Sequence, residues 1–289
     1  AAAVHTSQPG ISKQMQLLEA ELGVELFIRS GNRIIDLTEP ARRIVDIANV
    51  ILRESDSLKA AAREFLDGRS GSLRVAATFT LARYALPRVL QRFVARYPRV
   101  ELKLLQGSSD QVCKLTASGE CDFALTTRPA ETFPELALVE YCTLPRALMV
   151  QAGHALTRAK RITLKSIAAQ PLITLDFGSY GQARMRERFQ REGLAPNIVF
   201  SGANVDVVKA FVEAGLGIAV LPRIAYQQSR DPGLRALGVD HLFEPHQGCI
   251  ALRKNHYLRR YAYDFIEIVA PRLDRSTVQK TLGAARAGY

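Results

Sequence analysis

The feature that most constrains the fold is the alternation of strand-type and helix-type segments along residues 73–270. Short apolar runs, such as 73–77, alternate with longer amphipathic segments, such as 81–97. This order is typical of parallel βαβ units, which bind ligands at the carboxyl ends of their strands. The pattern predicts strands at 73–77, 100–105, 122–126, 146–150, 172–175, 198–201, 217–221 and 249–253, and helices at 81–97, 109–118, 182–192, 205–214 and 258–270.

These strands and helices fall into two similar sets, which predicts two subdomains with a cleft between them. We expect the whole α/β domain to cover residues 68–289. Subdomain I would comprise about 72–145 and 248–270, and subdomain II would comprise about 146–247. A ligand site is expected in the cleft.

The first thirty residues predict a helix of the kind that binds DNA. Ser7 is a suitable N-cap residue, Pro9 is suited to the first turn, and Gly23 is suited to end the helix. One face is apolar at helical spacing, with Ile11, Met15, Leu18 and Leu22, and we expect it to be buried. The opposite face is polar, and its side chains suit base edges and phosphates in a major groove. The expected DNA contacts on this helix are Ser7, Gln8, Pro9, Ser12, Lys13 and Gln16. An ordinary amphipathic surface helix would show the same spacing.

A small hairpin is expected directly after this helix. Two β-type runs, 26–29 and 34–37, flank a turn-rich tetrad. A helix followed by a hairpin is the plan of a winged helix-turn-helix domain, which would cover residues 1–38. On the wing, Arg29 and Arg33 would contact DNA phosphates, although surface arginines can equally be solvated.

A long helix is expected over residues 39–67, with Thr38 as its cap and Pro40 in its first turn. Apolar and small residues recur on it at alternating spacings of four and three, at Ile44, Ala48, Ile51, Ser55, Leu58, Ala62 and Phe65. A narrow seam of this kind usually packs against a partner helix, so we expect a dimer. The alternative is that the helix packs on the core of its own domain. The stretch 68–72 reads as a hinge-like linker.

The net charge of +11 does not by itself identify a DNA-binding protein. Residues 1–67 carry eight Lys and Arg against ten Asp and Glu, so the positive excess lies in the remainder. That excess favours an anionic small ligand or general phosphate affinity.

Several other classes of protein receive no support from the sequence. No apolar run has the roughly 18–20 residues that span a bilayer, and the first residues lack a signal-peptide pattern. We therefore expect a cytoplasmic protein without a membrane partner, and the absence of an initial Met suggests that the first segment is missing. The four cysteines form no C-x-x-C pair, and His241 and His246 lack companion ligands, so neither a metal nor another cofactor is expected.

Two stretches near the N-terminus, 6–14 and 17–27, resemble the recognition helix and wing entry of LysR-type transcriptional regulators. The resemblance extends along essentially the whole chain. It implies an N-terminal winged helix-turn-helix, a long linker helix and a C-terminal α/β effector domain of two subdomains, similar to periplasmic binding proteins. It also implies promoter DNA as a partner and a homodimer or homotetramer as the assembly.

Further stretches resemble the CysB-like branch of that family, which regulates sulfur assimilation and cysteine biosynthesis. They are residues 82–87, 96–100, 106–108, 204–209 and 261–266. The resemblance implies a small anionic effector from sulfur metabolism, such as sulfate, thiosulfate or acetylserine.

The effector site is expected where the first strand of the α/β domain meets its first helix. Thr78 and Thr80 stand there, and hydroxyls beside free N–H groups at a helix start suit an anion. Thr80 alone could also be a plain helix cap. By resemblance, Thr127 and Asn204 join the site. Leu81 and Tyr180 also belong to it, but the branch commonly has Gln and Thr at these two positions.

These two replacements would remove hydrogen bonds to a sulfate. At about 1.5–3 kcal/mol for each bond to a charged group, binding would weaken roughly ten-fold to ten-thousand-fold. We therefore expect an effector that differs from the usual one or is larger.

Two other functions are compatible with an α/β domain of this kind. An α/β enzyme receives no support, because the chain lacks a nucleophile elbow and a P-loop, and Gly215 and Gly217 precede a strand instead of following one. A two-lobed solute-binding protein would share the α/β fold, but it would leave residues 1–67 unexplained. Binding to promoter DNA would distinguish a regulator from both.

Overall fold

A computed structural model gives the structure of the chain, which falls into two compact units, residues 1–59 and 60–289. Each unit is described by itself. The structure describes residues 8–31, 33–45, 47, 48, 51, 52, 55, 58, 62, 69–175, 180–254 and 256–283.

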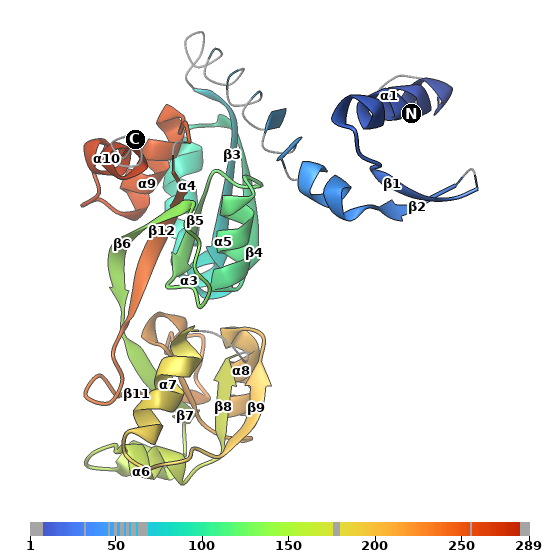
Figure 1. Ribbon diagram of the computed structural model, residues 1–289. Helices are drawn as coiled ribbons and strands as arrows, with labels where there is room; N and C mark the ends of the chain where they lie inside the picture. Colours follow the sequence, from blue (N-terminus) through green and yellow to red (C-terminus); the bar gives the residue numbers. More distant parts are fainter. Residues whose placement is uncertain are drawn as a thin grey trace. The chain divides into compact units, whose positions relative to one another are not determined.

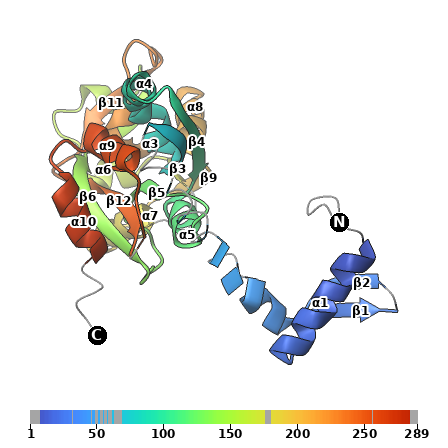
Figure 2. The same ribbon diagram turned by 90° about the horizontal axis from the view of Figure 1, so that it is seen from above.

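The first unit contains a helix followed by a hairpin (Figures 1 and 2). Helix α1 (Gln8–Leu22) ends at Gly23, whose positive φ of 69° suits a glycine and whose N–H donates to the Glu19 carbonyl at 2.9 Å. Strands β1 (Phe27–Ser30) and β2 (Arg33–Leu37) pair antiparallel, so the expected hairpin is confirmed. The apolar face of α1 is half-buried in this unit. It was expected to be buried, and this was wrong most clearly at Leu22, whose side chain is 44% exposed because the described residues of this unit cover it only in part.

Thr38 caps the next helix, as the sequence predicts. Its hydroxyl accepts the N–H of Ala41 at 3.2 Å and donates to the carbonyl of Glu25 at 2.7 Å. Residues 39–45 are helical, and so are the described residues at six of the seven seam positions. Phe65 and Ser7 lie outside the described residues.

The second unit has two lobes. Lobe I is built on a five-stranded sheet in the order β4-β3-β5-β12-β6. Its strands are β3 (Ser70–Thr78), β4 (Arg99–Gly107), β5 (Phe123–Thr127), β6 (Leu136–Leu144) and β12 (His246–Arg253). β3 runs parallel to β4 and β5, whereas β12 runs antiparallel to β5 and β6.

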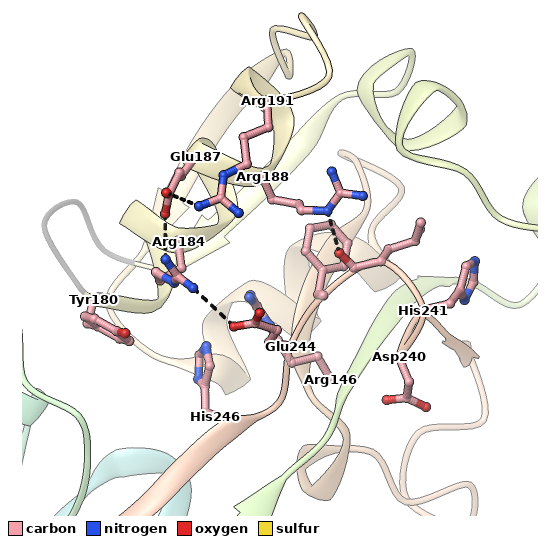
Figure 3. A pocket seen from close by; sticks show the side chains of 12 residues that line it. Arg146, Tyr180, Arg184, Glu187, Arg188, Arg191, Asp240, His241, Glu244 and His246 are labelled. Atoms are coloured by element: carbon pink, nitrogen blue, oxygen red, sulfur yellow. Dashed lines mark hydrogen bonds and ion pairs between the residues drawn. The ribbon is translucent and has the colours of Figure 1, made fainter.

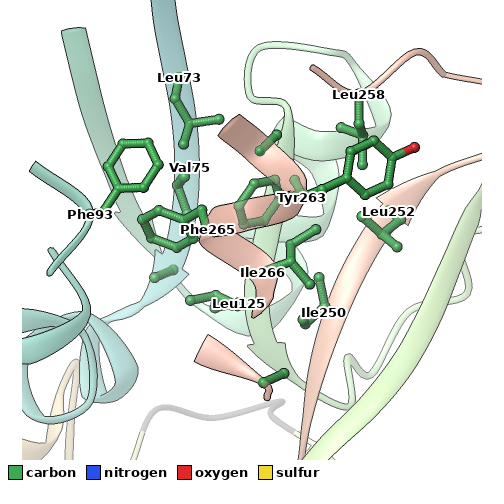
Figure 4. Close-up of a cluster of buried hydrophobic side chains, with 14 of the residues drawn as sticks. Leu73, Val75, Phe93, Leu125, Ile250, Leu252, Leu258, Tyr263, Phe265 and Ile266 are labelled. Carbon is green, nitrogen blue, oxygen red and sulfur yellow. The ribbon is translucent and has the colours of Figure 1, made fainter. Parts of the chain in front are cut away.

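Helices cover both faces of this sheet. They are α3 (Phe79–Tyr84), α4 (Leu86–Arg96), α5 (Ser109–Ala117), α9 (Arg260–Val269) and α10 (Arg275–Gly283). On one face Phe93 of α4 meets Phe265 of α9 at 5.1 Å between ring centroids (Figure 4). On the other face α5 packs Val112 and Cys113 against the sheet. These buried aromatic contacts fix lobe I.

The single helix expected at 81–97 is two helices, α3 and α4, separated at Ala85. Pro87 causes the break, because it has no N–H for the carbonyl one turn earlier and restricts the residue before it.

Lobe II is also built from strands and helices in alternation. Its strands are β7 (Arg146–Gln151), β8 (Leu172–Leu175), β9 (Ile198–Gly202), β10 (Ala219–Pro222) and β11 (Leu234–Gly238). Its helices are α6 (Leu164–Ala168), α7 (Tyr180–Gln190) and α8 (Val205–Glu213), with 3-10 turns η2 (Ala155–Arg158) and η3 (Arg223–Ala225). β10 and β11 flank β7 antiparallel, and β8 pairs parallel with β9.

The α/β class is confirmed, but the expectation of parallel strands throughout was wrong. β6 and β11 were not predicted, and both pair antiparallel, as β12 does. β6 alternates buried and exposed residues, including Glu140, so it lacks the continuous apolar run of a central parallel strand. β6 leads directly to β7 without a helical crossover, so it need not run parallel to its neighbours.

The chain crosses between the lobes twice, and the two crossings lie side by side. The first runs from Leu144 to Arg146 through Pro145, and the second enters β12 at His246. Leu144 is the register partner of His246 (Figure 1). No helix in the described part of the chain is long and apolar enough to cross a membrane.

Candidate functional site

A cavity of about 140 Å³ lies between the two lobes. Its lining includes all six side chains that the sequence singles out for a ligand. Lobe I contributes Thr78, Thr80, Leu81 and Thr127, and lobe II contributes Tyr180 and Asn204. Residues from positions 78 to 204 are thus brought to one place by the ends of strands β3 and β5 and the starts of helices α3, α7 and α8.

Hydroxyl groups form one part of this cavity. Thr78 is the N-cap residue of α3, but its side chain makes no capping hydrogen bond. Thr80 lies inside the first turn, so interpreting Thr80 as the helix cap is wrong. The hydroxyls of Ser109 and Thr127 lie 2.8 Å apart and share a hydrogen bond. These groups can donate to the oxygens of an anion.

Two helix caps also border the cavity. Asn204 caps α8 through its side-chain oxygen, which accepts the N–H of Val207 at 3.0 Å. Ser108 caps α5 by accepting the N–H of Gln111 at 3.2 Å. The cap explains why Asn204 is held in place, and it leaves the amide NH₂ group as a donor.

Two arginines give the cavity a positive charge. Arg128 is exposed, and its guanidinium lies 5.9 Å from the ring centroid of Tyr180. Arg146 is only 6% exposed, and its burial lowers the pKa of its guanidinium to about 10. None of the described residues that line the cavity is acidic. The cavity therefore favours an anion.

His246 lies beside Arg146 at the crossing between the lobes. Burial, with the nearby charge of Arg146, lowers the pKa of its imidazole to about 4. A Cβ added to Gly181 would lie 2.5 Å from Cε1 of this ring, so the ring packs against the start of α7. Near neutral pH the imidazole is uncharged and can donate or accept one hydrogen bond at each nitrogen.

Sequence reasoning did not identify Ser109, Arg128, Arg146 or His246 as site residues. Arg128 directly follows Thr127, and Ser109 directly follows the stretch 106–108 that resembles the CysB-like branch, so each had a usable signal. Arg146 and His246 reach the cavity only because the two crossing strands pair with one another.

A larger groove of about 300 Å³ lies on lobe II beside the cavity (Figure 3). Arg146, Tyr180 and His246 line both hollows. Three other guanidiniums of the groove are held in ion pairs. Arg184 pairs with Glu187 at 2.8 Å and with Glu244 at 3.2 Å, Arg191 pairs with Glu187 at 2.6 Å, and Arg188 pairs with Glu192 at 3.0 Å.

A polar network joins helix α3 of lobe I to helix α8 of lobe II; we call it the α3–α8 bridge. Tyr84 donates its hydroxyl to Asp206 Oδ1 at 2.6 Å, and Arg83 Nε lies 2.9 Å from the same oxygen. Lys209 Nζ donates to the Tyr84 hydroxyl at 3.3 Å and pairs with Asp231 at 2.7 Å. The side chains of that pair are only 10% and 11% exposed. The same two helices line the cavity, so a bound molecule would act on both.

The residues expected to contact DNA lie on α1 and the hairpin. Pro9, Ser12, Lys13 and Gln16 are exposed along α1, and Arg33 is exposed on β2. Arg29 is 39% exposed at its side chain and pairs with Glu19 at 3.2 Å, so part of its charge is already neutralised. Gln8 begins α1, but its side chain and the whole of Ser7 lie outside the described residues.

Metal ligands do not gather at any of these places. Within the described ranges, no group of three or more His, Cys, Asp and Glu side chains could hold a metal ion. The free thiols of Cys113 and Cys121 are buried, and their pKa values are raised to about 12 and about 11, mainly by burial.

Comparison with known families gives two matches. Residues 1–42 match "Bacterial regulatory helix-turn-helix protein, lysR family", and residues 66–274 match "LysR substrate binding domain". Two relatives from Burkholderia cenocepacia are 39% identical to this chain. The transcriptional regulator SsuR matches over 98% of this chain and 92% of its own length, and the regulator CysB over 100% and 92%.

Solved structures show the same fold. The cofactor-binding domain of the Cbl transcriptional regulator superposes with a TM-score of 0.70 at 32% identity, covering 74% of this chain and 93% of that one. Full-length CbnR in complex with its target DNA superposes with a TM-score of 0.66 at 22% identity, covering 93% and 91%.

Proposed function

Because this chain belongs to the LysR family of DNA-binding transcriptional regulators, we propose that it controls transcription of sulfur-metabolism genes in response to a small anionic effector bound between its two lobes. The alternatives, a solute-binding protein or an α/β enzyme, do not account for a helix-turn-helix of this family at residues 1–42. We assign the protein no catalytic role, and as a regulator it acts in the cytoplasm, where its promoter DNA lies.

The observation that carries the effector proposal is the composition of the inter-lobe cavity. It combines hydroxyls from Thr78, Thr80 and Thr127 with two guanidiniums, and the described residues that line it include no carboxylate. A lining with hydrogen-bond donors and positive charge, but without carboxylates among the described residues, favours an anionic ligand over a cationic one. The relatives SsuR and CysB and the resemblance to the CysB-like branch support an effector from sulfur metabolism.

The effector class is narrowed by Leu81 and Tyr180. Leu81 is 1% exposed and belongs to the core of lobe I, so it presents only apolar atoms to the cavity. Tyr180 brings an aromatic ring against Arg128. We propose that the effector carries a sulfate- or sulfonate-type group among the threonines and an apolar part beside these two residues.

The domain assignment follows the same proposal. Residues 1–38 form the DNA-binding domain, 39–67 the linker helix and 68–289 the effector domain. Within the effector domain, subdomain I spans about 72–145 and 248–270, and subdomain II about 146–247. Pairing along the linker helix would place two winged helices on a pseudo-palindromic promoter site.

Effector binding would be coupled to DNA binding through the arrangement of the two lobes. An effector that binds one arrangement of the lobes more tightly shifts the population toward it by its differential affinity. The α3–α8 bridge lies beside the cavity, and both helices line it, so it is placed to respond. The lobes of paired chains would then alter the spacing of the winged helices on DNA.

The test combines ligand and DNA binding on the full chain. A thermal-melt screen would use sulfate, thiosulfate, acetylserine and simple sulfonates, and a ligand at about 100 times its Kd should add about 2.7 kcal/mol of stability. We expect at least one to raise the melting temperature of the wild type and of Thr163→Ala, but not of Thr80→Ala. The same ligand should change electrophoretic retardation of promoter DNA. Thr80→Ala and Tyr180→Phe variants with unaltered affinity for every ligand would show that the site is assigned wrongly.

A further inference from the structure

The inter-lobe cavity contains a buried cation, Arg146, that forms no ion pair within the part of the chain that the structure describes. Arg146 donates from Nη2 to the Val220 carbonyl at 3.3 Å, but its buried Nε has no hydrogen-bond partner in the described part of the chain. No carboxylate of the described residues pairs with it. Nε2 of His246 is likewise buried and without a partner there.

An unpaired guanidinium is costly to bury. Removing it from water costs several kcal/mol unless a counter-charge and hydrogen bonds replace the lost hydration. The Phe243 ring, 5.4 Å from the guanidinium carbon of Arg146, supplies only part of that compensation. A group that remains buried at such a cost, at the wall of a cavity, is a candidate for ligand binding.

The neighbouring groove does not account for this cation. Its other guanidiniums, on Arg184, Arg188 and Arg191, each have a glutamate within 3.2 Å. An anion in the groove would have to displace those glutamates, whereas an anion at Arg146 would displace no carboxylate of the described residues. Among the described cations that line the two hollows, the buried one without a counter-charge is therefore the one at the cavity wall.

Arg146 and His246 are also separate from the hydroxyl groups in the fold. Each is the first residue of a strand at a crossing between the lobes, β7 and β12. Thr78, Thr80 and Thr127 belong to the strand ends and first helix of lobe I. Apolar side chains complete the lining, among them Leu144 and Leu175.

We propose that Arg146 and His246 form a second subsite of the cavity, which binds a carboxylate at one end of an effector whose sulfur-oxyanion group lies among Thr78, Thr80 and Thr127. The effector is then a small two-headed anion with a short apolar spacer. This inference rests on the proposed function, since it assumes that the cavity is the effector site.

The experiment compares matched ligands on the full chain. Thermal-melt titrations would use inorganic sulfate, ethanesulfonate and 1-propanesulfonate as one-headed probes, and sulfoacetate and 3-sulfopropanoate as two-headed probes. We expect at least one two-headed probe to bind the wild type about ten- to hundred-fold more tightly than its one-headed match, the gain of one charged hydrogen-bonded contact. That gain should persist in the groove variant Arg184→Gln and disappear in Arg146→Met, so that the two-headed probe binds Arg146→Met no more tightly than its one-headed match.

The outcomes separate the two proposals. Suppose that one-headed probes bind in a Thr80-dependent manner. If no two-headed probe then binds more tightly than its one-headed match, or if the tighter binding persists in Arg146→Met, the second subsite is refuted and the proposed function stands. If no probe gives a Thr80-dependent shift, both are refuted.

A purely structural role for Arg146 is tested by two further measurements. Without ligand, Arg146→Met should melt at or above the wild-type temperature, because an apolar side chain removes an unpaired buried charge. Arg146→Lys should retain part of the two-headed gain through its charge. A melting temperature in Arg146→Met well below that of the wild type, with sulfate affinity lost as well, would overturn the proposal.

Discussion

Two half-buried histidines of the effector domain, His246 and His256, should make its stability depend on pH. Burial lowers the pKa of His246 and of His256 to about 4, with Arg146 and Arg253 as the nearest charges that add to the effect. An unfolded chain would titrate these rings near their ordinary 6.5. Between those values the unfolded state binds protons that the folded state does not, so stability is complete above pH 6.5 and falls as the pH drops toward 4.

The free energy of unfolding should therefore decrease by up to about 3 kcal/mol for each of these rings between pH 7 and pH 4. Urea unfolding at pH 7, 6, 5 and 4 would measure this slope. His246→Gln and His256→Gln should each flatten it, whereas the exposed His241→Gln serves as the histidine-removal control. Equal slopes in the wild type and both buried-site variants would disprove this origin of the pH dependence.

At the scale of secondary-structure elements, we expect helix α1 to contact DNA phosphates through Lys13. Lys13 is exposed on this helix. Each phosphate that a protein neutralises adds about 0.9 to the magnitude of the slope of log K against log salt, so loss of one contact lowers it by about that amount. Lys13→Ala should weaken binding to all DNA sequences alike and reduce that slope, as measured by retardation at several salt concentrations. Lys280→Ala on α10 is the control, and an unchanged slope in Lys13→Ala would remove Lys13 from the interface.

The α3–α8 bridge supports a second prediction at this scale. Tyr84→Phe removes the hydroxyl that bonds Asp206 and Lys209 across the lobes. One lost hydrogen bond of about 0.5–1.5 kcal/mol should raise the Kd for the effector by roughly two- to ten-fold, if the bonded arrangement is the one that binds. Tyr226→Phe makes the same change within lobe II, where the hydroxyl donates to the Leu234 carbonyl. Identical affinities in both variants would show that the bridge does not set the lobe equilibrium.

The sequence could place most elements and the hydroxyl part of the cavity, but not the cations at the crossing. Thr78 is predictable because it ends an apolar strand just before the first helix of the domain, whereas Thr127 follows only from the resemblance to the CysB-like branch. Arg146 and His246 are 100 positions apart, and only the antiparallel register of β6 with β12 brings the two crossings together. A register between distant strands leaves no local signal in the sequence. The antiparallel strands were also missed because the expected pattern required a helix between successive strands, and none lies between β6 and β7. Pro87, in contrast, was a visible signal that the helix at 81–97 would break.

For the whole molecule, the linker helix carries the prediction of pairing. Ile51 and Leu58 lie on its seam and are 64% and 72% exposed in the single chain. Exposed apolar residues at heptad spacing are stabilised by a second helix. Ile51→Asp and Leu58→Asp should therefore yield monomers in analytical ultracentrifugation, whereas we expect the wild type to sediment as a dimer or tetramer.

The matched control is Ile35→Asp on the hairpin, because Ile35 is also 64% exposed but lies off the seam. It should leave the oligomeric state unchanged. If Ile51→Asp and Leu58→Asp both remain oligomeric, the contact between chains lies outside the seam. The alternative, that the linker helix packs on the core of its own domain, would then be favoured.

The order of strands in lobe I has a consequence for how the chain is made. β12 lies between β5 and β6, yet it follows β6 only after the whole of lobe II. A ribosome that adds 5–20 residues per second needs about 5–20 s to cover that interval. During this interval β5 and β6 lack β12, the strand that pairs with both of them, whereas all the strands of lobe II have been synthesised by its end. Lobe I is thus begun first and completed last, so two strand edges of the nascent chain stay open until β12 emerges.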